Sequence, residues 1–418
     1  MLDLQAVRAE FPALSDGAVA ADGRLSDARP NASDAMPWIL FDNAGGSQTL
    51  ARVADRARAY LSSPQVQLGA SYEASLHSSA RVAAASVETA RFLAANDPRE
   101  IVLGPSTTQL LHNLARAMEG TLSPGDEIVV TDADHEANIG AWRRLEARGV
   151  VVREWQVDRD TMRLELPGLE PLLTPRTRLV CFTHVSNVLG SIHDVAAITR
   201  FVRARAPQAR ALVDGVAYAP HAKVDVASWD VDYYVFSFYK VYGPHFAVLY
   251  GKRAALEELP CVHHDFIGKG NVPYKLQPGN VCFELAHAVG GIYEYFAALG
   301  PSAWSDISAH EEQLSERLLA FLRDAPGVRI HGERTASRAL RVPTISFTVA
   351  GRSSEEIVRS VDAHRIGIRW GDFYARRLID ALGVRPQGGV VRASMVHYNT
   401  LGEVDRLVRA LKQVLAGH

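Results

Sequence analysis

Cysteine is scarce in this sequence. Its 418 residues contain three, Cys181, Cys261 and Cys282, with neither the density of a disulfide scaffold nor the short repeats typical of zinc sites. We therefore expect a protein of a reducing compartment that holds no metal. Cys181 lies within an apolar run, so we expect it to be buried like an apolar residue rather than to act as a nucleophile.

Long apolar runs and an excess of one charge are also missing. No run reaches the roughly 18 apolar residues that span a bilayer, and the opening residues MLDLQAVRAEF do not follow the basic-then-apolar pattern of a secretion signal. Lys and Arg total 45 against 47 for Asp and Glu, which gives a net charge of −2. We expect a cytoplasmic protein with no membrane partner and no nucleic-acid partner.

The chain does have enough apolar material for more than one core, since 47% of its residues are hydrophobic and its length exceeds what one core usually sustains. Residues 16–36 are rich in Gly, Ala, Ser and Asp, which predicts a mobile surface loop. From about residue 301 helices alternate with short strands, which predicts an α+β domain. We therefore predict an N-terminal segment, 1–40, packing on the small domain; a large domain, 41–300; and a small domain, 301–418.

Apolar spacing also predicts individual helices. Leu4, Val7 and Phe11 recur at helical spacing and predict a short amphipathic helix within residues 1–15. Ala-rich stretches predict helices within residues 51–97, and a further helix is expected from Glu284 to Leu299, where it would close the large domain.

The most informative stretch runs from Arg210 to Gly251. An apolar run predicts a buried strand that ends at Asp214, and residues 232–237 predict a second strand followed by Lys240. Open α/β sheets place their ligand sites at the carboxyl ends of such strands. A lysine amine forms a Schiff base with an aldehyde, and an acid facing a pyridinium nitrogen keeps that ring protonated, as in pyridoxal phosphate (PLP) enzymes. On spacing alone, a surface lysine paired with an unrelated acid is the alternative.

A second candidate motif begins at Ile101 and reads IVLGPSTTQLLHNLARAM, which predicts a strand, a turn and a helix. Ser and Thr at the start of a helix cap its free N–H groups, and the same helix end can bind phosphate. On sequence alone, Thr107 and Thr108 could either cap the helix or bind a phosphate group.

Four further sites allow an ordinary structural explanation on sequence alone. FDNAGGSQ, from Phe41, contains a glycine pair that fits a tight turn. TDADHEAN offers acids and His135 after a strand, but no fourth metal ligand follows, so a strand-end cap is favoured over a metal site. Asn187 fits a turn, and Arg392, in VVRASMVHYNT, fits a strand-end surface arginine.

Together these sequence motifs resemble those of a known family. VDGVAY, DYYVFSFYK and YGP, with their spacing, resemble the class V aminotransferases of fold-type I PLP enzymes, and within them the cysteine desulfurase-like proteins. The resemblance covers roughly Phe41 to the carboxyl terminus. It implies an α/β fold with a large, mostly parallel seven-stranded mixed sheet and a smaller C-terminal α+β domain. It also implies pyridoxal 5'-phosphate as cofactor, an α-amino acid substrate and a homodimer with active sites at the interface.

The resemblance assigns cofactor roles residue by residue. Lys240 would bind the cofactor covalently, and Asp214 would pair with its pyridine nitrogen. His135 would stack on the ring, and Asn187 would approach the phenolic oxygen. The phosphate would be held by the residues that match the family's phosphate-binding words, which are Thr107, Thr108, Ser237 and Tyr239.

Three assignments concern the substrate and the partner subunit. Arg392 would hold the substrate α-carboxylate with its two-pronged guanidinium, next to Asn187. Asn43 would line the substrate pocket. Asn280 stands where family members carry a threonine that reaches the phosphate of the partner subunit.

The sequence also departs from the family. Ala217 replaces a glutamine that bonds the phenolic oxygen, and Tyr239 replaces the histidine before the desulfurase lysine. Desulfurases carry a sulfur-accepting cysteine on a small-domain loop, where GIRWGDFYARRL places Phe373, Tyr374 and Ala375. Residues 301–418 contain no cysteine.

Without that thiol the persulfide route is closed unless Cys282 or Cys261 takes part, which nothing in the sequence indicates. We therefore expect elimination of the C–S lyase type on an α-amino acid, without a protein persulfide. Transamination and racemisation are alternatives within the family. A protein of the same fold that binds the cofactor without catalysis is an alternative of another class.

Overall fold

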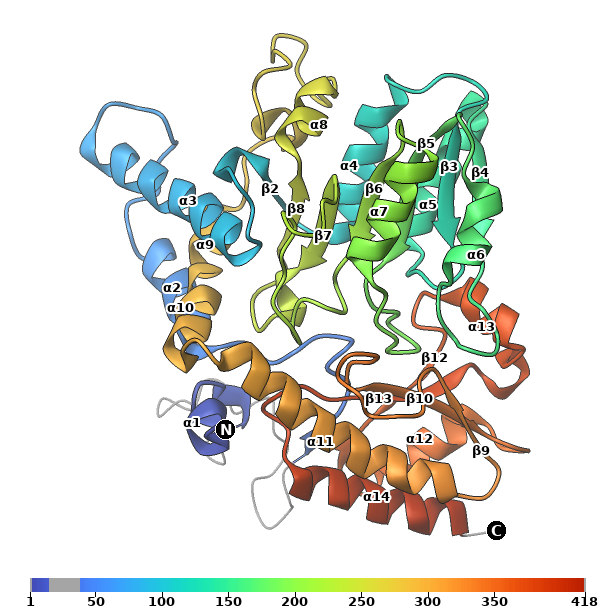
Figure 1. Ribbon diagram of the computed structural model, residues 1–418. Helices are drawn as coiled ribbons and strands as arrows, with labels where there is room; N and C mark the ends of the chain where they lie inside the picture. The colour runs from blue at the N-terminus through green and yellow to red at the C-terminus, as the bar shows by residue number, and fades with distance from the viewer. Residues whose placement is uncertain (1, 15–37, 417–418) are drawn as a thin grey trace.

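The computed structural model describes residues 2–14 and 38–416, so the loop predicted at residues 16–36 lies outside the described residues. A seven-stranded sheet of order β2-β8-β7-β6-β5-β3-β4 dominates the large domain (Figure 1). Its strands are β2 (Ile101–Gly104), β3 (Glu127–Thr131), β4 (Val151–Trp155), β5 (Thr177–Thr183), β6 (Arg210–Asp214), β7 (Tyr233–Ser237) and β8 (Ala247–Gly251). Only β8 runs in the direction opposite to the other six strands, so the predicted fold class is confirmed.

Helices cover both faces of this sheet, which explains why its central strands are mostly apolar and buried. On β5, Val180 packs with α7 (Val195–Arg205), whereas its neighbour Cys181 packs with α4 (Thr107–Glu119) on the opposite face. Successive side chains of a strand point to opposite faces, so both sets become buried. The other helices of residues 2–300 are α1 (Leu4–Ala9), α2 (Ala51–Leu61), α3 (Glu73–Phe92), α5 (Ala137–Arg143), α6 (Leu166–Leu169), α8 (Arg253–Glu258), α9 (Phe283–Ala288) and α10 (Gly290–Leu299).

A four-stranded antiparallel sheet of order β12-β13-β10-β9 follows in the C-terminal part of the chain. Its strands are β9 (Val328–His331), β10 (Thr344–Val349), β12 (Arg369–Gly371) and β13 (Val390–Ser394), and its helices are α11 (Ala303–Asp324), α12 (Ser354–Asp362), α13 (Arg376–Leu382) and α14 (Leu401–Ala416). The long helices α11 and α14 lie side by side beneath the sheet (Figure 1). The division near residue 300 stays a prediction, and this second core supports it.

The start of the chain contacts both halves of the protein. Strand β1 (Ile39–Leu40) pairs in parallel with β11 (Ile366–Gly367), and Ile39 belongs to the C-terminal core. The ring of Phe11 lies 4.8 Å from that of Tyr398 and 5.6 Å from that of Tyr242. The N-terminal segment therefore contacts the large domain as well as the small one on which it was predicted to pack.

The structure corrects two predicted helices. The stretch from Glu284 to Leu299 forms two helices, α9 and α10, that meet at Val289. The glycine pair that opens α10 lies tightly against α2, because a Cβ on Gly291 would come within 2.8 Å of the Val53 nitrogen. Glycine permits this close approach because it has no Cβ, and it also weakens a continuous helix. The first helix is shorter than its apolar spacing predicted, since it ends at Ala9, before Phe11, and a 3-10 turn follows. No described helix is long and apolar enough to cross a membrane.

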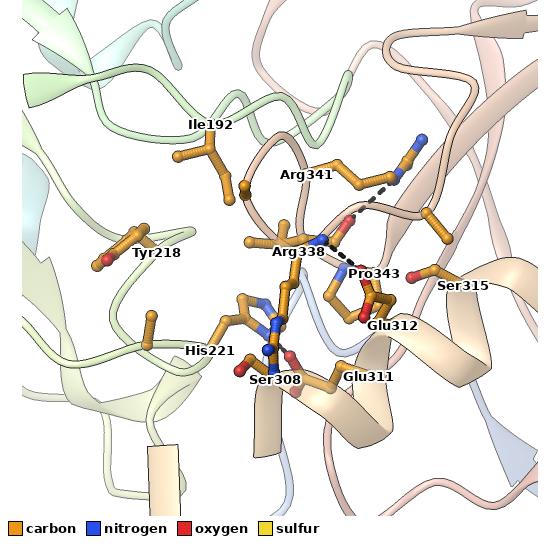
Figure 2. Close-up of a pocket in the computed structure, with 14 residues that line it drawn as sticks. Ile192, Tyr218, His221, Ser308, Glu311, Glu312, Ser315, Arg338, Arg341 and Pro343 are labelled. Atoms are coloured by element: carbon orange, nitrogen blue, oxygen red, sulfur yellow. Dashed lines mark hydrogen bonds and ion pairs between the residues drawn. The ribbon is translucent and has the colours of Figure 1, made fainter. Parts of the chain in front are cut away.

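A pocket at the junction of the two domains contains a buried ionisable pair (Figure 2). His221, from the loop after β6, places its Nδ1 atom 2.9 Å from Oε2 of Glu311 on α11. Glu311 is 3% exposed, and its Oε1 atom makes no hydrogen bond with another described residue. Burial raises the pKa of Glu311, and His221 opposes that shift.

We predict that His221→Ala lowers the free energy of unfolding by about 1–3 kcal/mol, because it leaves the buried carboxyl group of Glu311 without its side-chain partner. Urea denaturation would measure the change. His77→Ala, at an exposed position on α3, is the matched control and should stay within about 0.5 kcal/mol of the unsubstituted protein. Equal stability of the two variants would contradict the prediction.

Candidate active site

The carboxyl ends of the central strands surround one pocket. The loop after β5 contributes Asn187, β6 ends at Asp214, and the turn after β7 carries Lys240. The pocket brings together most of the predicted cofactor residues, which are Thr107, Thr108, His135, Asn187, Asp214, Ser237, Tyr239 and Lys240. Ligand sites of open α/β sheets lie at this edge.

One end of the pocket is suited to an anion. Ser106 caps α4 and accepts a hydrogen bond from the Gln109 backbone N–H. The hydroxyls of Thr107 and Ser237 lie 2.7 Å apart, and Thr108 is exposed at the same helix end. The free N–H groups and the dipole of a 13-residue helix, together with these hydroxyls, fit a phosphate group.

Lys240 and Asp214 are both buried in this pocket. Burial and the nearby positive charge of Arg392 lower the pKa of Lys240 to about 8, against the opposing effect of Asp214. Burial raises the pKa of Asp214 to about 6, although the Val216 N–H donates to its Oδ1 at 2.9 Å and Lys240 also favours the charged form. The pocket therefore contains an amine that loses its proton readily and a carboxylate that a facing cation would stabilise.

His135 provides a flat ring on another wall. Its Nδ1 accepts a hydrogen bond from the Ala137 N–H at 3.1 Å, which leaves the ring proton on Nε2. Burial and the positive charges of Lys240 and Arg392 lower the pKa of His135 to about 4, so the ring is neutral at pH 7. A neutral, buried aromatic ring suits stacking on a heteroaromatic cofactor.

These residues fit a cofactor that combines an aldehyde, a pyridine ring and a phosphate. The helix end, the carboxylate and the amine are the three groups that such a molecule requires, and they line one pocket. Asn187 adds a buried Oδ1 atom that has no hydrogen-bond partner among the described residues. Ala217 also lines the pocket and offers no side-chain donor. Individual residue roles stay predictions.

Arg392 reaches the pocket from the small-domain strand β13. It is 2% exposed, and its Nη1 donates to the Asn187 carbonyl at 3.0 Å. Its Nη2 pairs with Oδ1 of Asp42 at 2.9 Å, and the ring of Phe373 lies 3.7 Å from its Cζ. Burial lowers the pKa of Arg392 to about 10, so it remains a cation at pH 7. The guanidinium group therefore lies beside the pocket, as a carboxylate ligand would require.

Asn43 makes structural hydrogen bonds through both atoms of its amide. Its Nδ2 donates to the carbonyl oxygens of Leu40 and Ser394 and to Oδ1 of Asn399, and its Oδ1 accepts from the Tyr398 hydroxyl. The amide is 3% exposed and is occupied by these four partners. These contacts give Asn43 a structural role at the domain junction, and its predicted contact with a substrate stays a prediction.

Two other residues of the FDNAGGSQ motif, Ser47 and Asp42, contact residues of the site. Ser47 donates from its N–H and its hydroxyl to the Tyr239 carbonyl and accepts from the Tyr242 N–H, so it braces the turn that carries Lys240. Asp42 pairs with Arg392. The sequence motif contains Ser47 and Asp42, but nothing in it indicates either contact. Asn280 is exposed and donates to Gln67 at 3.2 Å, and its role toward a partner subunit stays a prediction.

No thiol lines this pocket in the described part of the chain. Cys181 is fully buried within β5, as predicted, and burial raises its pKa well above the usual range. Burial and Glu284 raise the pKa of Cys282 to about 11, which disfavours its thiolate. No three His, Cys, Asp or Glu side chains gather into a metal-binding group within residues 2–14 and 38–416.

Known proteins resemble this chain over most of its length. The Aminotransferase class-V family matches residues 39–407. The aminotransferase-like protein FGM3 of Gibberella zeae is 43% identical over 384 residues, which cover 90% of this chain and 94% of that protein. The cysteine desulfurase-like protein ustD of Aspergillus flavus is 36% identical over 328 residues, which cover 76% of this chain and 74% of that protein. The crystal structure of the cysteine desulfurase CsdA from Escherichia coli matches with a TM-score of 0.83 at 26% identity, over 100% of this chain and 99% of the other.

We predict that the Lys240 amine of the cofactor-free protein reacts with pyridoxal phosphate with a midpoint near pH 8. Below its pKa the amine holds a proton and is not nucleophilic, so the rate should rise with pH and level off above about 8. Stopped-flow absorbance would measure the rate, and Lys240→Ala should abolish it.

Two variants should move this midpoint in opposite directions. Asp214→Asn removes a charge that raises the Lys240 pKa and should shift the midpoint down, whereas Arg392→Gln removes a charge that lowers it and should shift it up. A midpoint near the ordinary lysine pKa of about 10.4, or shifts of the opposite sign, would contradict the assignment.

Proposed function

The chain belongs to the class-V aminotransferase family of PLP-dependent enzymes, and we propose that it removes a β-substituent from an α-amino acid by C–S lyase-type elimination, without a protein persulfide. One observation carries the proposal. The pocket with Lys240, Asp214 and the adjacent Arg392 is complete, whereas the loop that bears the acceptor thiol in desulfurases presents Phe373 and Tyr374. A substituent that leaves this site must therefore depart without a thiol acceptor.

The chain's own residues support each step of such a reaction. Bound PLP would supply an electron sink for the bond that breaks at Cα. Arg392 would hold the substrate carboxylate by charge-assisted hydrogen bonds. The Lys240 Nζ would take the Cα proton, and its pKa near 8 suits a general base at neutral pH. Asp214 would keep a proton on the nitrogen that it faces. The substituent would leave Cβ with the bonding electron pair and take up a proton.

A second candidate is the loss of an anionic β-substituent. Arg369 on β12 pairs across the sheet with Arg392, and both guanidinium groups contact Asp42, at 3.5 and 2.9 Å. This second cation beside the site favours a substrate with an acidic side chain. A β-carboxylate would leave as CO2 and a β-sulfinate as SO2, and the electron pair left on Cβ would take a proton to give alanine. Neither departure needs a thiol acceptor.

We also propose that the enzyme is a cytoplasmic homodimer. Large apolar side chains are exposed on α2, α3 and the loop around residue 266, where Leu61, Leu76 and Phe266 are 58%, 56% and 83% exposed. In a homodimer the partner subunit would cover such side chains. Light scattering is expected to give twice the chain mass of 45.6 kDa. A monomer with full activity would contradict the dimer.

Product analysis tests the reaction on cysteine, cysteine sulfinate and aspartate. Elimination predicts sulfide, pyruvate and ammonia from cysteine, whereas the second candidate predicts alanine with CO2 or SO2 from the acidic substrates. Transamination would give a keto acid that keeps the substrate side chain, together with aminated cofactor, and would overturn both.

The double variant Cys261→Ala/Cys282→Ala is the control for the persulfide-free route. It removes both cysteines that are not fully buried. We expect its kcat to stay within about twofold of the unsubstituted enzyme, because neither thiol lines the pocket. If the unsubstituted enzyme forms sulfide and alanine from cysteine and the double variant does not, a protein thiol accepts the sulfur.

A further inference from the structure

We propose that the loop Gly371–Ala375 orients the substrate-binding guanidinium group and that Phe373 is the positioning residue for Arg392. The inference rests on the proposed function, since it concerns how the α-carboxylate of the substrate is recognised. It assigns a role to the loop at the place where desulfurases carry their thiol.

Contacts on its edge and on its face fix the Arg392 guanidinium. The Asn187 carbonyl accepts a hydrogen bond from Nη1, and Asp42 pairs with Nη2, so two nitrogen atoms on the edge of the guanidinium group have fixed partners. The ring of Phe373 lies 3.7 Å from Cζ and covers one face. An aromatic ring at this distance from a buried cation attracts it through the ring quadrupole and restrains the guanidinium plane. Since carboxylates bind guanidinium groups in that plane, the stack sets the direction from which a substrate carboxylate is bound.

The loop is itself attached to the large domain. The Phe373 carbonyl accepts from Asn187 Nδ2 at 2.9 Å, and the Tyr374 carbonyl accepts from the Glu136 N–H at 2.8 Å. The rings of Tyr374 and His135 lie 5.2 Å apart. Three side chains of the site, Arg392, Asn187 and His135, thus contact two successive loop residues.

The backbone of the loop is unusual for its side chains. Phe373 and Tyr374 have φ values of 53° and 59°, in the left-handed region that large side chains rarely adopt. Such backbones persist where surrounding contacts determine them. Here the two carbonyl contacts and the stack on Arg392 hold the aromatic pair in place, which suits a fixed positioning element rather than a loop that carries a group between sites.

The test compares ligands with and without a carboxylate on three variants of the PLP-loaded enzyme. Phe373→Leu removes the ring and keeps an apolar side chain. Phe373→Asn also removes the ring, but it introduces a residue that adopts the left-handed backbone conformation readily. Phe373→Tyr keeps the ring. Absorbance titrations would give the Kd for cysteine and for cysteamine, which differ only in the carboxylate. Retained cofactor absorbance would confirm that each variant is folded.

We expect the Leu and Asn variants to raise the Kd for cysteine by roughly tenfold to thirtyfold, the size of a buried cation–π contact, and to leave the Kd for cysteamine unchanged. The Tyr variant should resemble the unsubstituted enzyme. Trp370→Leu, which removes a ring of β12 that lies 5.4 Å from Cζ of Arg359 on α12, is the matched control and should change neither Kd.

Two results would overturn the inference. One is an unchanged Kd for cysteine in both ringless variants, and the other is a parallel rise for cysteine and cysteamine, which would mean a general loss of the pocket. Failure of the proposed function looks different, because the unsubstituted enzyme would then release no sulfide and pyruvate from cysteine, whatever the Kd values of the variants. If Phe373→Leu loses the cofactor, the Asn and Tyr variants still decide the question.

Discussion

The site depends on the burial of an amine and a carboxylate at neighbouring strand ends. Lys240 and Asp214 lie where a parallel sheet places its ligands, and the low polarity of that position moves both pKa values toward neutrality. Neither shift would occur on the surface, so the helices on both faces of the sheet are part of the chemistry. The glycine after Asp214 shows how closely the interior is packed, because a Cβ at Gly215 would overlap the Tyr234 ring.

The second domain contributes through one buried arginine. Arg392 arises from β13 of the small sheet, but its partners, Asp42 and the Asn187 carbonyl, come from segments that precede the small domain. His221 and Glu311 join the domains at the other end of the junction. The two halves of the site are thus held by charged contacts across a boundary, and movement of the small domain would separate the guanidinium group from the amine.

Local patterns predicted the sheet, the family and most of the pocket, since strand-end residues such as Asp214 and helix-start residues such as Thr107 occupy positions that backbone geometry determines. The motif around Asn43 predicts a loop near the site, but it does not predict the hydrogen bonds that this side chain makes to Leu40, Ser394 and Asn399. The break at Val289 and the stack of Phe373 on Arg392 depend on residues far apart in the chain. Periodicity carries no information about such contacts.

Asp42 has a consequence for ligand exchange. Its carboxylate is bound to the guanidinium group that is expected to receive the substrate carboxylate, so the protein carries a tethered competitor for its own ligand. Tethering keeps the local concentration of this carboxylate high, and an incoming acid must displace or share it. The net affinity is therefore a difference between two similar interactions, which favours rapid release of a carboxylate product over tight retention.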